Sequence, residues 1–152
     1  MYRGGRPNRW ARWQNRLSAT LFAARPGGRG RLVTLEVPGR RTSRVVAFPL
    51  VVADYEGERY LVAMLGERTN WVRNVRAADG RAVLRRGRRE AVRLCEVDPG
   101  VRAPILRRYL AVAPGARPHV PVDRRAPLAE FEHIAARIPV FRVIPYFTSA
   151  GR

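Results

Sequence analysis

Short stretches with the alternating pattern of β-strands, most of them joined by tight turns, occupy much of the chain after residue 30. The six stretches cover residues 31–37, 45–54, 59–65, 82–85, 89–97 and 140–144. The tripeptides E-G-E and R-G-R precede two of them and are typical of hairpin turns. Short hairpin-linked strands bury one face each by closing on themselves, so the pattern predicts a small antiparallel β-barrel. Pro49 indicates an edge strand or a bulge.

Segments with helical spacing of apolar residues interrupt these strands. One covers residues 69–78, and another begins within residues 98–110, either at an Asp-Pro cap or at the second proline of this stretch. A third follows a proline and covers residues 128–138. We therefore predict an α+β fold with helices that flank the barrel. The Pro-rich loop 113–125, which contains His119, has a length that is typical of a lid or binding segment.

The length of the chain limits the number of domains. Its 152 residues suffice for one domain that buries about two thirds of its unfolded surface. A hydrophobic fraction of 46% excludes a largely disordered chain. The single cysteine, Cys95, excludes an internal disulfide, and the two histidines lack ligand spacing, so we predict no metal site. We assign residues 26–152 to the barrel domain and residues 1–25 to a separate N-terminal arm.

Positive charge dominates the composition. Thirty basic residues, all of them arginine, against twelve acidic residues give a net charge of +18. Such a charge attracts nucleic acids, anionic membranes or anionic small molecules, although GC-rich coding would also raise the arginine content. The chain lacks a basic face interleaved with aromatic residues in a known reader fold, so we do not expect it to bind nucleic acid.

The N-terminal arm has the pattern of a basic amphipathic helix. Trp10, Trp13, Leu17 and Leu21 repeat at helical spacing, with arginines on a neighbouring face. Such a helix packs on its own domain or, as the alternative, contacts an anionic membrane peripherally through residues 8–24. No segment approaches the roughly 20 apolar residues of a membrane span. No signal-peptide cleavage site follows the short apolar stretch at residues 17–24. We expect a cytoplasmic protein, with membrane association as the alternative.

Two connections have the composition of ligand-binding turns. Residues 38–44 (P-G-R-R-T-S-R) join the first two predicted strands, and arginine forks with short hydroxyl residues bind phosphate or carboxylate. The alternative is a solvated basic hairpin. Residues 63–71 lead from a strand through a glycine turn to a helix start, where backbone N–H groups can receive an anion or a ring edge. The alternative there is an ordinary core strand and helix cap.

Four blocks in this order resemble the deazaflavin-dependent nitroreductase family. They are G-R-R-T-S (39–43), F-P-L (48–50), Y-L-V-A-M-L-G (60–66) and N-W-V-R-N-V (70–75), and the resemblance extends over roughly residues 20–145. Members of this family adopt a split β-barrel related to the one that binds flavin mononucleotide, and they use coenzyme F420. The resemblance therefore implies a split-barrel fold with F420 (8-hydroxy-5-deazaflavin) as the cofactor, FMN being the less favoured cofactor.

The resemblance also implies which residues contact the cofactor. The turn at residues 40–43 would hold the phosphate and polyglutamate tail, and the other positions would lie against the deazaflavin ring or close its pocket. These residues are Arg40, Arg41, Thr42 and Ser43 for the tail, and Pro49, Val51, Val62, Met64, Leu65, Gly66, Asn70, Trp71 and Asn74 for the ring. No catalytic side chain is implied, because the cofactor itself delivers the hydride.

The chain departs from the family pattern at several of these positions. The family's loop usually reads A-S-K-G-G, whereas residues 63–67 read A-M-L-G-E, so a hydroxyl and a cation are missing. Val46 stands where the family has a further arginine, and Ser43 stands where it has a glycine. Each lost charge-assisted contact is worth about 1.5–3 kcal/mol, so we expect weakened cofactor binding, which the basic surface partly offsets.

The resemblance implies a deazaflavin-dependent oxidoreductase, and we expect it to transfer a hydride from reduced F420 to a small electron-poor acceptor. Quinones, nitro compounds and activated alkenes are such acceptors. The alternative is a non-catalytic split-barrel protein that binds a flavin, haem or fatty acid, which the apolar Met64 and Leu65 favour. Small split barrels often dimerise, so a homodimer is compatible with the sequence. We expect His119 to be a loop residue and Cys95 a small core residue.

Overall fold

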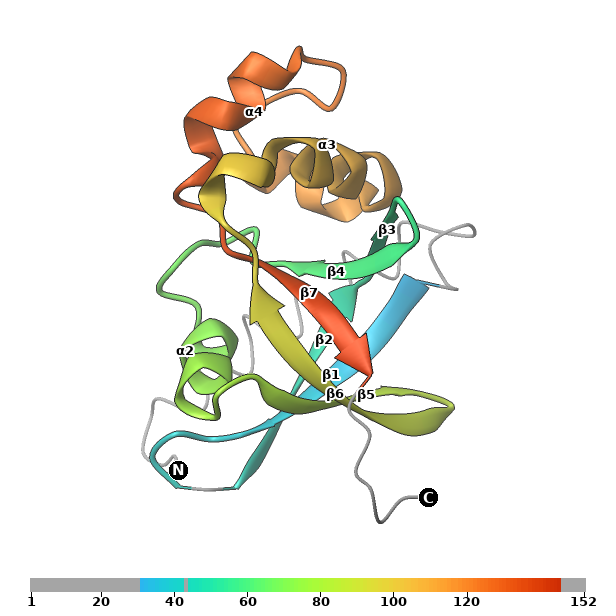
Figure 1. Ribbon diagram of the computed structural model, residues 1–152, viewed down its shortest axis with the longest axis vertical. Helices are drawn as coiled ribbons and strands as arrows, with labels where there is room; N and C mark the ends of the chain where they lie inside the picture. The colour runs from blue at the N-terminus through green and yellow to red at the C-terminus, as the bar shows by residue number, and fades with distance from the viewer. Residues whose placement is uncertain (1–30, 43, 146–152) are drawn as a thin grey trace.

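The computed structural model describes residues 31–42 and 44–145, which form one curled sheet flanked by helices (Figure 1). The sheet has seven strands in the order β2-β1-β5-β6-β7-β4-β3, and every neighbouring pair is antiparallel. The strands are β1 Leu32–Pro38, β2 Val45–Val51, β3 Ala53–Tyr55, β4 Glu58–Val62, β5 Arg81–Arg86, β6 Arg88–Glu96 and β7 Val140–Pro145. This architecture confirms the predicted α+β class and the small antiparallel split barrel.

The chain forms one strand more than the alternating pattern predicted, because residues 45–54 break at Val52 into β2 and β3. The Val52 N–H still donates to the Arg31 carbonyl oxygen at 2.8 Å, in register with the β1–β2 pairing, and from Ala53 on the chain pairs with β4. β2 is an edge strand of the sheet, which confirms the position expected from Pro49. β4 ends at Val62, three residues before the predicted end, because the chain turns there toward a helix.

Both predicted hairpins are confirmed. Glu56 and Gly57 connect β3 to β4 with φ angles of 49° and 82°, the geometry of a two-residue turn with two positive φ angles. Gly87, with φ 81°, connects β5 to β6. Arg86 at the end of β5 and Arg88 at the start of β6 are paired in register. Glycine at these positions adopts the left-handed backbone without a Cβ clash.

The helices lie close to their predicted places. They are α2 Asn70–Ala77, α3 Ala103–Val112 and α4 Leu128–Ala135, with 3-10 turns η2 Pro99–Val101 and η3 Pro114–His119. The Asp98 carboxylate caps η2 by accepting from the Gly100 N–H at 3.0 Å. Consequently α3 itself begins at Ala103, between the two predicted starts. The helix expected to reach residue 138 ends at Ala135.

The side chain of Trp71 fills one end of the barrel, which we call the closed end. Trp71 of α2 is buried and lies between Phe48 of β2 and Phe141 of β7, with ring centroids 6.5 and 5.7 Å apart. These two phenylalanines pair in register with the fully buried Leu35 and Leu61, so the indole fills the interior at one end. In Figure 1, α2 lies at the left, and the β5–β6 hairpin reaches toward the opposite side. The helix α3 packs against β3 and β4, and α4 packs against α3 on the side away from the sheet.

The predicted N-terminal arm (residues 1–25), its stretch 8–24 and Ser43 lie outside the described residues. Among the helices of the described part, none is long and apolar enough to cross a membrane.

Candidate functional site

The arginine turn, which we define as residues 39–44, connects β1 to β2 at the end of the barrel that α2 closes. Gly39 donates its N–H to the Arg44 carbonyl oxygen at 2.7 Å, and the Thr42 hydroxyl accepts from the Arg44 N–H at 3.2 Å. A Cβ on Gly39 would lie 3.1 Å from that same Arg44 oxygen, so glycine allows the tight approach. Arg40, Arg41, Thr42 and Arg44 are all exposed on this turn.

Arg40 fastens the arginine turn to α2. Its guanidinium Nη1 donates to Asn74 Oδ1 at 2.8 Å, and its backbone N–H donates to the same oxygen at 3.1 Å. A longer contact of 3.4 Å joins Nη2 to Asn70 Oδ1. Asn74 is buried, which fixes its amide beneath the turn. The structure thus brings together three of the predicted site residues from segments that lie thirty or more positions apart in the sequence.

The charge of the arginine turn is not neutralised by this docking, because the partners of Arg40 are neutral amides. Burial lowers the pKa of Arg40, and the nearby charges of Arg41 and Arg73 lower it further. No carboxylate of the described residues lies within ion-pair distance of Arg40, Arg41, Arg44 or Arg73. The sequence contains no acidic residue between Glu36 and Asp54 either. This end of the barrel therefore has an uncompensated positive charge.

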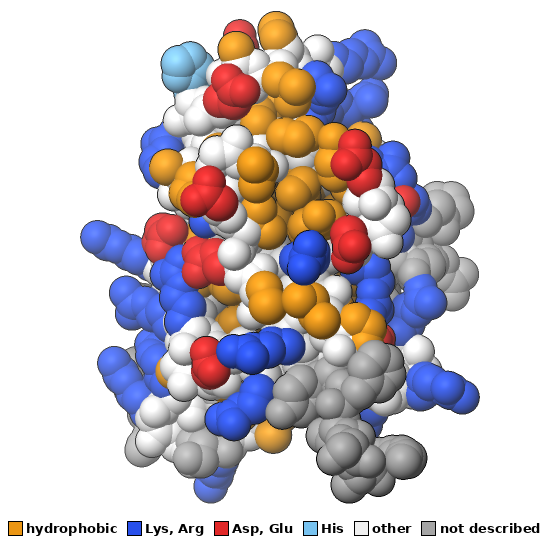
Figure 2. Space-filling model, viewed as in Figure 1, with side chains coloured by type: hydrophobic (Ala, Val, Ile, Leu, Met, Phe, Trp, Pro, Cys, Tyr) orange, Lys and Arg blue, Asp and Glu red, His pale blue; other side chains and the backbone are white. Residues whose placement is uncertain are grey.

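Elsewhere many arginines are paired with acids. Glu36 accepts from Arg85 and Arg89, and Arg76 donates to both Glu67 and Glu96. Figure 2 shows arginine side chains along both flanks and the lower half of one face, with acidic side chains among them and apolar side chains gathered above. The net charge is thus distributed over the surface, and the arginines of the arginine turn are among those that no acid of the described residues pairs with.

The connection from β4 to α2 has a shape fixed by hydrogen bonds. Gly66 adopts a φ of 97°, and its carbonyl oxygen accepts from the Thr69 hydroxyl at 2.7 Å. Glu67 accepts from Arg76 of α2 at 2.8 Å, which ties the loop to the helix, and this hydrogen bond lowers the pKa of Glu67. The departure from the family's glycine at Glu67 thus supplies a tether for the loop.

Met64 and Leu65, which stand where the family has serine and lysine, face different surroundings. The Met64 side chain is buried, and its sulfur accepts from the Tyr109 hydroxyl of α3 at 3.5 Å. Burial raises the pKa of Tyr109, so this hydroxyl stays protonated at neutral pH. Leu65 is 37% exposed. Of these two side chains, only Leu65 is exposed at this loop.

Several residues that the resemblance assigns to the ring site have buried side chains. Trp71 is 1% exposed, Val62 is 2% exposed and Val51 is 4% exposed. These three side chains belong to the hydrophobic core in the structure. Pro49 is half-buried on β2, and Val45, on the same face of that strand, is 63% exposed. The outer face of β2 therefore offers apolar surface next to the arginine turn.

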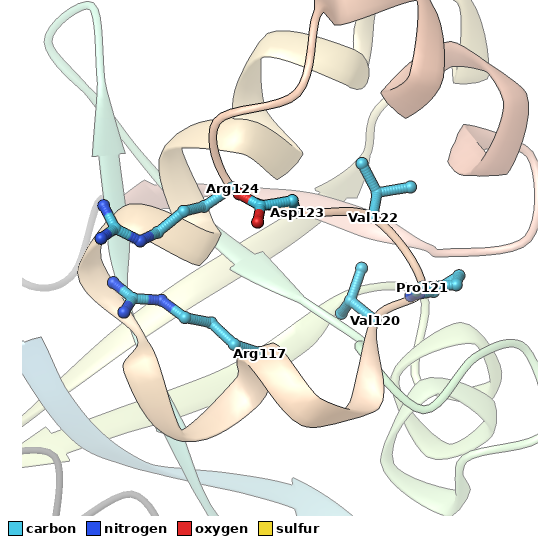
Figure 3. A pocket seen from close by; sticks show the side chains of 6 residues that line it. All are labelled: Arg117, Val120, Pro121, Val122, Asp123 and Arg124. Carbon is cyan, nitrogen blue, oxygen red and sulfur yellow. The ribbon is translucent and has the colours of Figure 1, made fainter.

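A hollow of about 380 Å³ lies in the connection between η3 and α4 (Figure 3). The guanidinium groups of Arg117 and Arg124 lie side by side at one end of it, and Val120 and Val122 line the other. Arg117 donates to the carbonyl oxygens of Leu110 and Ala111 at 2.9 and 3.3 Å. The Arg117 guanidinium thus satisfies carbonyl oxygens at the C-terminal end of α3 and stabilises that end of the helix.

A second and larger hollow, of about 760 Å³, lies at the end of the barrel away from α2. The sequence analysis did not identify it. Arg59 of β4 and Glu90 of β6 form a bidentate ion pair there, with distances of 2.9 and 2.8 Å. This pair lowers the pKa of Glu90 and raises that of Arg59. The alternation along β6 would have placed Glu90 on the inner face with Val92 and Leu94, which was a usable signal.

The two residues that we set aside as non-catalytic have different positions. Cys95 lies on β6 and is half-buried on the outer face, opposite Arg142 of β7, so it is less enclosed than a core position. His119 ends the 3-10 turn η3, as expected of a residue in the 113–125 loop. No group of three metal-ligating side chains occurs within residues 31–42 and 44–145.

Comparisons with known proteins place the fold. No family model matches the chain. No curated protein matches it either. An F420-H2 dependent reductase of known structure is similar with a TM-score of 0.52 and 21% identity, over 74% of this chain and 93% of that one. A domain-swapped dimer is similar with a TM-score of 0.50 and 17% identity, over 90% of this chain and 98% of that one.

A heme binding protein from Mycobacterium smegmatis is also similar, with a TM-score of 0.50 and 13% identity. That alignment covers 80% of this chain and 52% of the other. At these identities the likeness concerns the fold, which hosts different ligands in different proteins. The chain therefore has the split-barrel fold that an F420-H2 dependent reductase and a heme binding protein share.

Proposed function

We propose that the chain is an oxidoreductase that uses coenzyme F420 and passes a hydride from the reduced cofactor to a small electron-poor acceptor. The observation that carries this proposal is the arginine turn, whose positive charge no acid of the described residues compensates and which Asn74 fixes onto α2. The fold shared with an F420-H2 dependent reductase supports it. The resemblance of the four sequence blocks supplies the identity of the cofactor.

The donors at the arginine turn fit an anionic tail. Arg41 and Arg44 are exposed and Arg73 lies beside Arg40, so up to three guanidinium groups are free to donate to phosphate and carboxylate oxygens. Arg40 is committed to Asn74 and acts by placing the turn. We therefore assign Arg41 the principal role in holding the phosphate.

The apolar surface beside the turn would receive the ring system. When bound, reduced F420 supplies the hydride from C5 of its deazaflavin ring. Pro49 and the exposed part of Leu65 would exclude water from the ring face, and the backbone at Gly66 would lie at its edge. Met64 cannot replace the family's serine as a hydrogen-bond donor, so binding rests more strongly on the tail contacts.

The test is a titration of the purified full chain with oxidised F420, followed by turnover with reduced F420 and a panel of quinones, nitro compounds and enones. We expect saturable binding and consumption of reduced F420 with at least one acceptor. Arg41→Gln should weaken binding about tenfold or more, as expected for one charge-assisted contact. The matched control Arg125→Gln removes the same charge from an exposed loop residue and should leave binding within twofold.

The second candidate is a split-barrel binding protein without turnover. The apolar Leu65 surface and the pairing of Met64 with Tyr109 favour it, because both make this loop less polar than the family pattern. Protein that is purified with a flavin absorbance or a Soret band, and that fails to bind F420, would establish this candidate in place of the reductase.

A homodimer is part of the proposal, since a domain-swapped dimer has the same fold. Sedimentation equilibrium across a tenfold concentration range measures it directly. A single species of 17.2 kDa at all concentrations would contradict it.

A further inference from the structure

The larger hollow, of about 760 Å³, lies at the end of the barrel away from α2, which we call the open end. Its apolar wall consists of Val33 of β1, Val52 and Leu84 of β5. The ion pair between Arg59 and Glu90 is also part of its lining. A concave volume of this size with an apolar wall and a few polar groups is typical of small-molecule sites.

The carboxylates at this hollow already have partners. Both oxygens of Glu90 accept from Arg59, at 2.9 and 2.8 Å. Asp54 accepts from Arg31 at 3.1 Å and from Arg108 at 3.1 and 3.2 Å, and these hydrogen bonds lower its pKa. Both carboxylates are therefore already paired with arginines, and both remain ionised at neutral pH.

Two of the lining arginines, Arg86 and Arg88, have no such partner. No carboxylate in the described part of the chain lies within ion-pair distance of either one. They are paired in register across the β5–β6 hairpin, on either side of Gly87, and both line the hollow. Like charges directly opposite on an antiparallel pair destabilise the hairpin. The arrangement therefore retains a repulsive pair of cations at the rim of a concave apolar surface.

We propose that this hollow binds a phosphate monoester with a compact apolar body. The phosphate would contact Arg86 and Arg88, because two guanidinium groups match the charge of about −1.5 to −2 that a monoester has at pH 7. The apolar body would pack against Val33, Val52 and Leu84.

This second site is separate from the arginine turn. The hollow lies at the start of β1 and the arginine turn follows its last residue, so a strand of seven residues, about 20 Å long, separates them. The proposal does not depend on the oxidoreductase function, since it uses other residues at the other end of the barrel.

The experiment is a calorimetric titration of the full chain with hexyl phosphate at low salt. We expect saturable binding that the double variant R86Q/R88Q weakens at least tenfold. The control R125Q/R137Q removes two charges from exposed positions elsewhere and should change the affinity less than twofold. Equal affinity of R86Q/R88Q and the unmodified chain would overturn the proposal.

Two further measurements make the result specific. Inorganic phosphate should bind about tenfold more weakly than hexyl phosphate, because it lacks the apolar body, and equal affinities would contradict the role of the apolar wall. R86Q/R88Q should also melt at a temperature no lower than the unmodified chain, since the repulsive pair is removed. Arg41→Gln should leave hexyl phosphate binding unchanged, and a loss of binding there would assign the ligand to the arginine turn instead.

Discussion

Arginines at the two ends of the barrel have hydrogen-bond partners of different charge. At the closed end, Arg40 donates to the neutral amide of Asn74, and the neighbouring Arg41 and Arg73 have no described acid beside them. At the open end, Arg59 donates to Glu90 from both of its terminal nitrogens. The charge of an arginine paired with a carboxylate is compensated within the fold, whereas an arginine held by a neutral amide retains an uncompensated charge. The net charge of +18 alone does not separate these cases.

The closed end depends on the Trp71 indole, and its removal should cost the most. Trp71→Ala should lower the free energy of unfolding by about 3–5 kcal/mol, because the indole fills the barrel between Phe48 and Phe141. Val33→Ala at the open end should cost roughly 1–2 kcal/mol. Urea unfolding measures both, and a loss at Trp71 no larger than the loss at Val33 would contradict the role of the indole in filling the barrel.

Removing the amide under the arginine turn should have the next largest effect. Asn74→Ala leaves the Arg40 N–H and guanidinium without their shared acceptor, which should cost about 1–3 kcal/mol of folding stability and also weaken F420 binding. Asn70→Ala should cost less stability, because it removes only one long contact at 3.4 Å from Arg40. If both variants bind F420 as the unmodified chain does, the docking of Arg40 is irrelevant to the site.

The ion pair at the open end predicts a pH dependence. The folded-state pKa of Glu90 is lowered by Arg59, so its stabilising contribution is present above the unfolded pKa and is lost as the pH falls through the folded value. Both side chains are 39% exposed, and solvent screening limits the effect to about 0.5–1 kcal/mol. Arg59→Gln should flatten the decline in unfolding free energy below pH 5. An unchanged slope would show that the pair contributes nothing.

The smallest effect is expected at an exposed pair. Arg93 donates to Asp79 at 3.0 Å, and the Asp79 side chain is 85% exposed. Arg93→Gln should therefore change the unfolding free energy by less than about 0.5 kcal/mol. A loss above 1 kcal/mol in thermal unfolding would mean that paired arginines on this surface matter more than their exposure indicates.

Much of the fold could be predicted from local sequence, because alternation and turn residues act over a few positions. The hairpins at Gly57 and Gly87 and the edge position of Pro49 are examples. The break at Val52 could not be predicted, since Val51, Val52 and Ala53 are all buried and form one continuous apolar run. A run without alternation does not show where a strand turns.

The site was less predictable because its contacts join distant segments. Arg40 and Asn74 are 34 positions apart, and Arg59 and Glu90 are 31 apart, so sequence shows neither which arginines are paired nor which are left free. The same limit applies to Trp71, whose helical spacing is compatible with a pocket or a core, and which the structure places in the core.

The most direct test compares coenzyme F420 with its deazaflavin core that lacks the phosphate and glutamate tail. If the arginine turn holds the tail, F420 should bind the full chain at least about tenfold more tightly than the tail-less core, and Arg41→Gln should abolish that difference. Equal affinity for the two ligands in the unmodified chain would contradict the account, because the uncompensated charge at this end would then serve no anion of the cofactor.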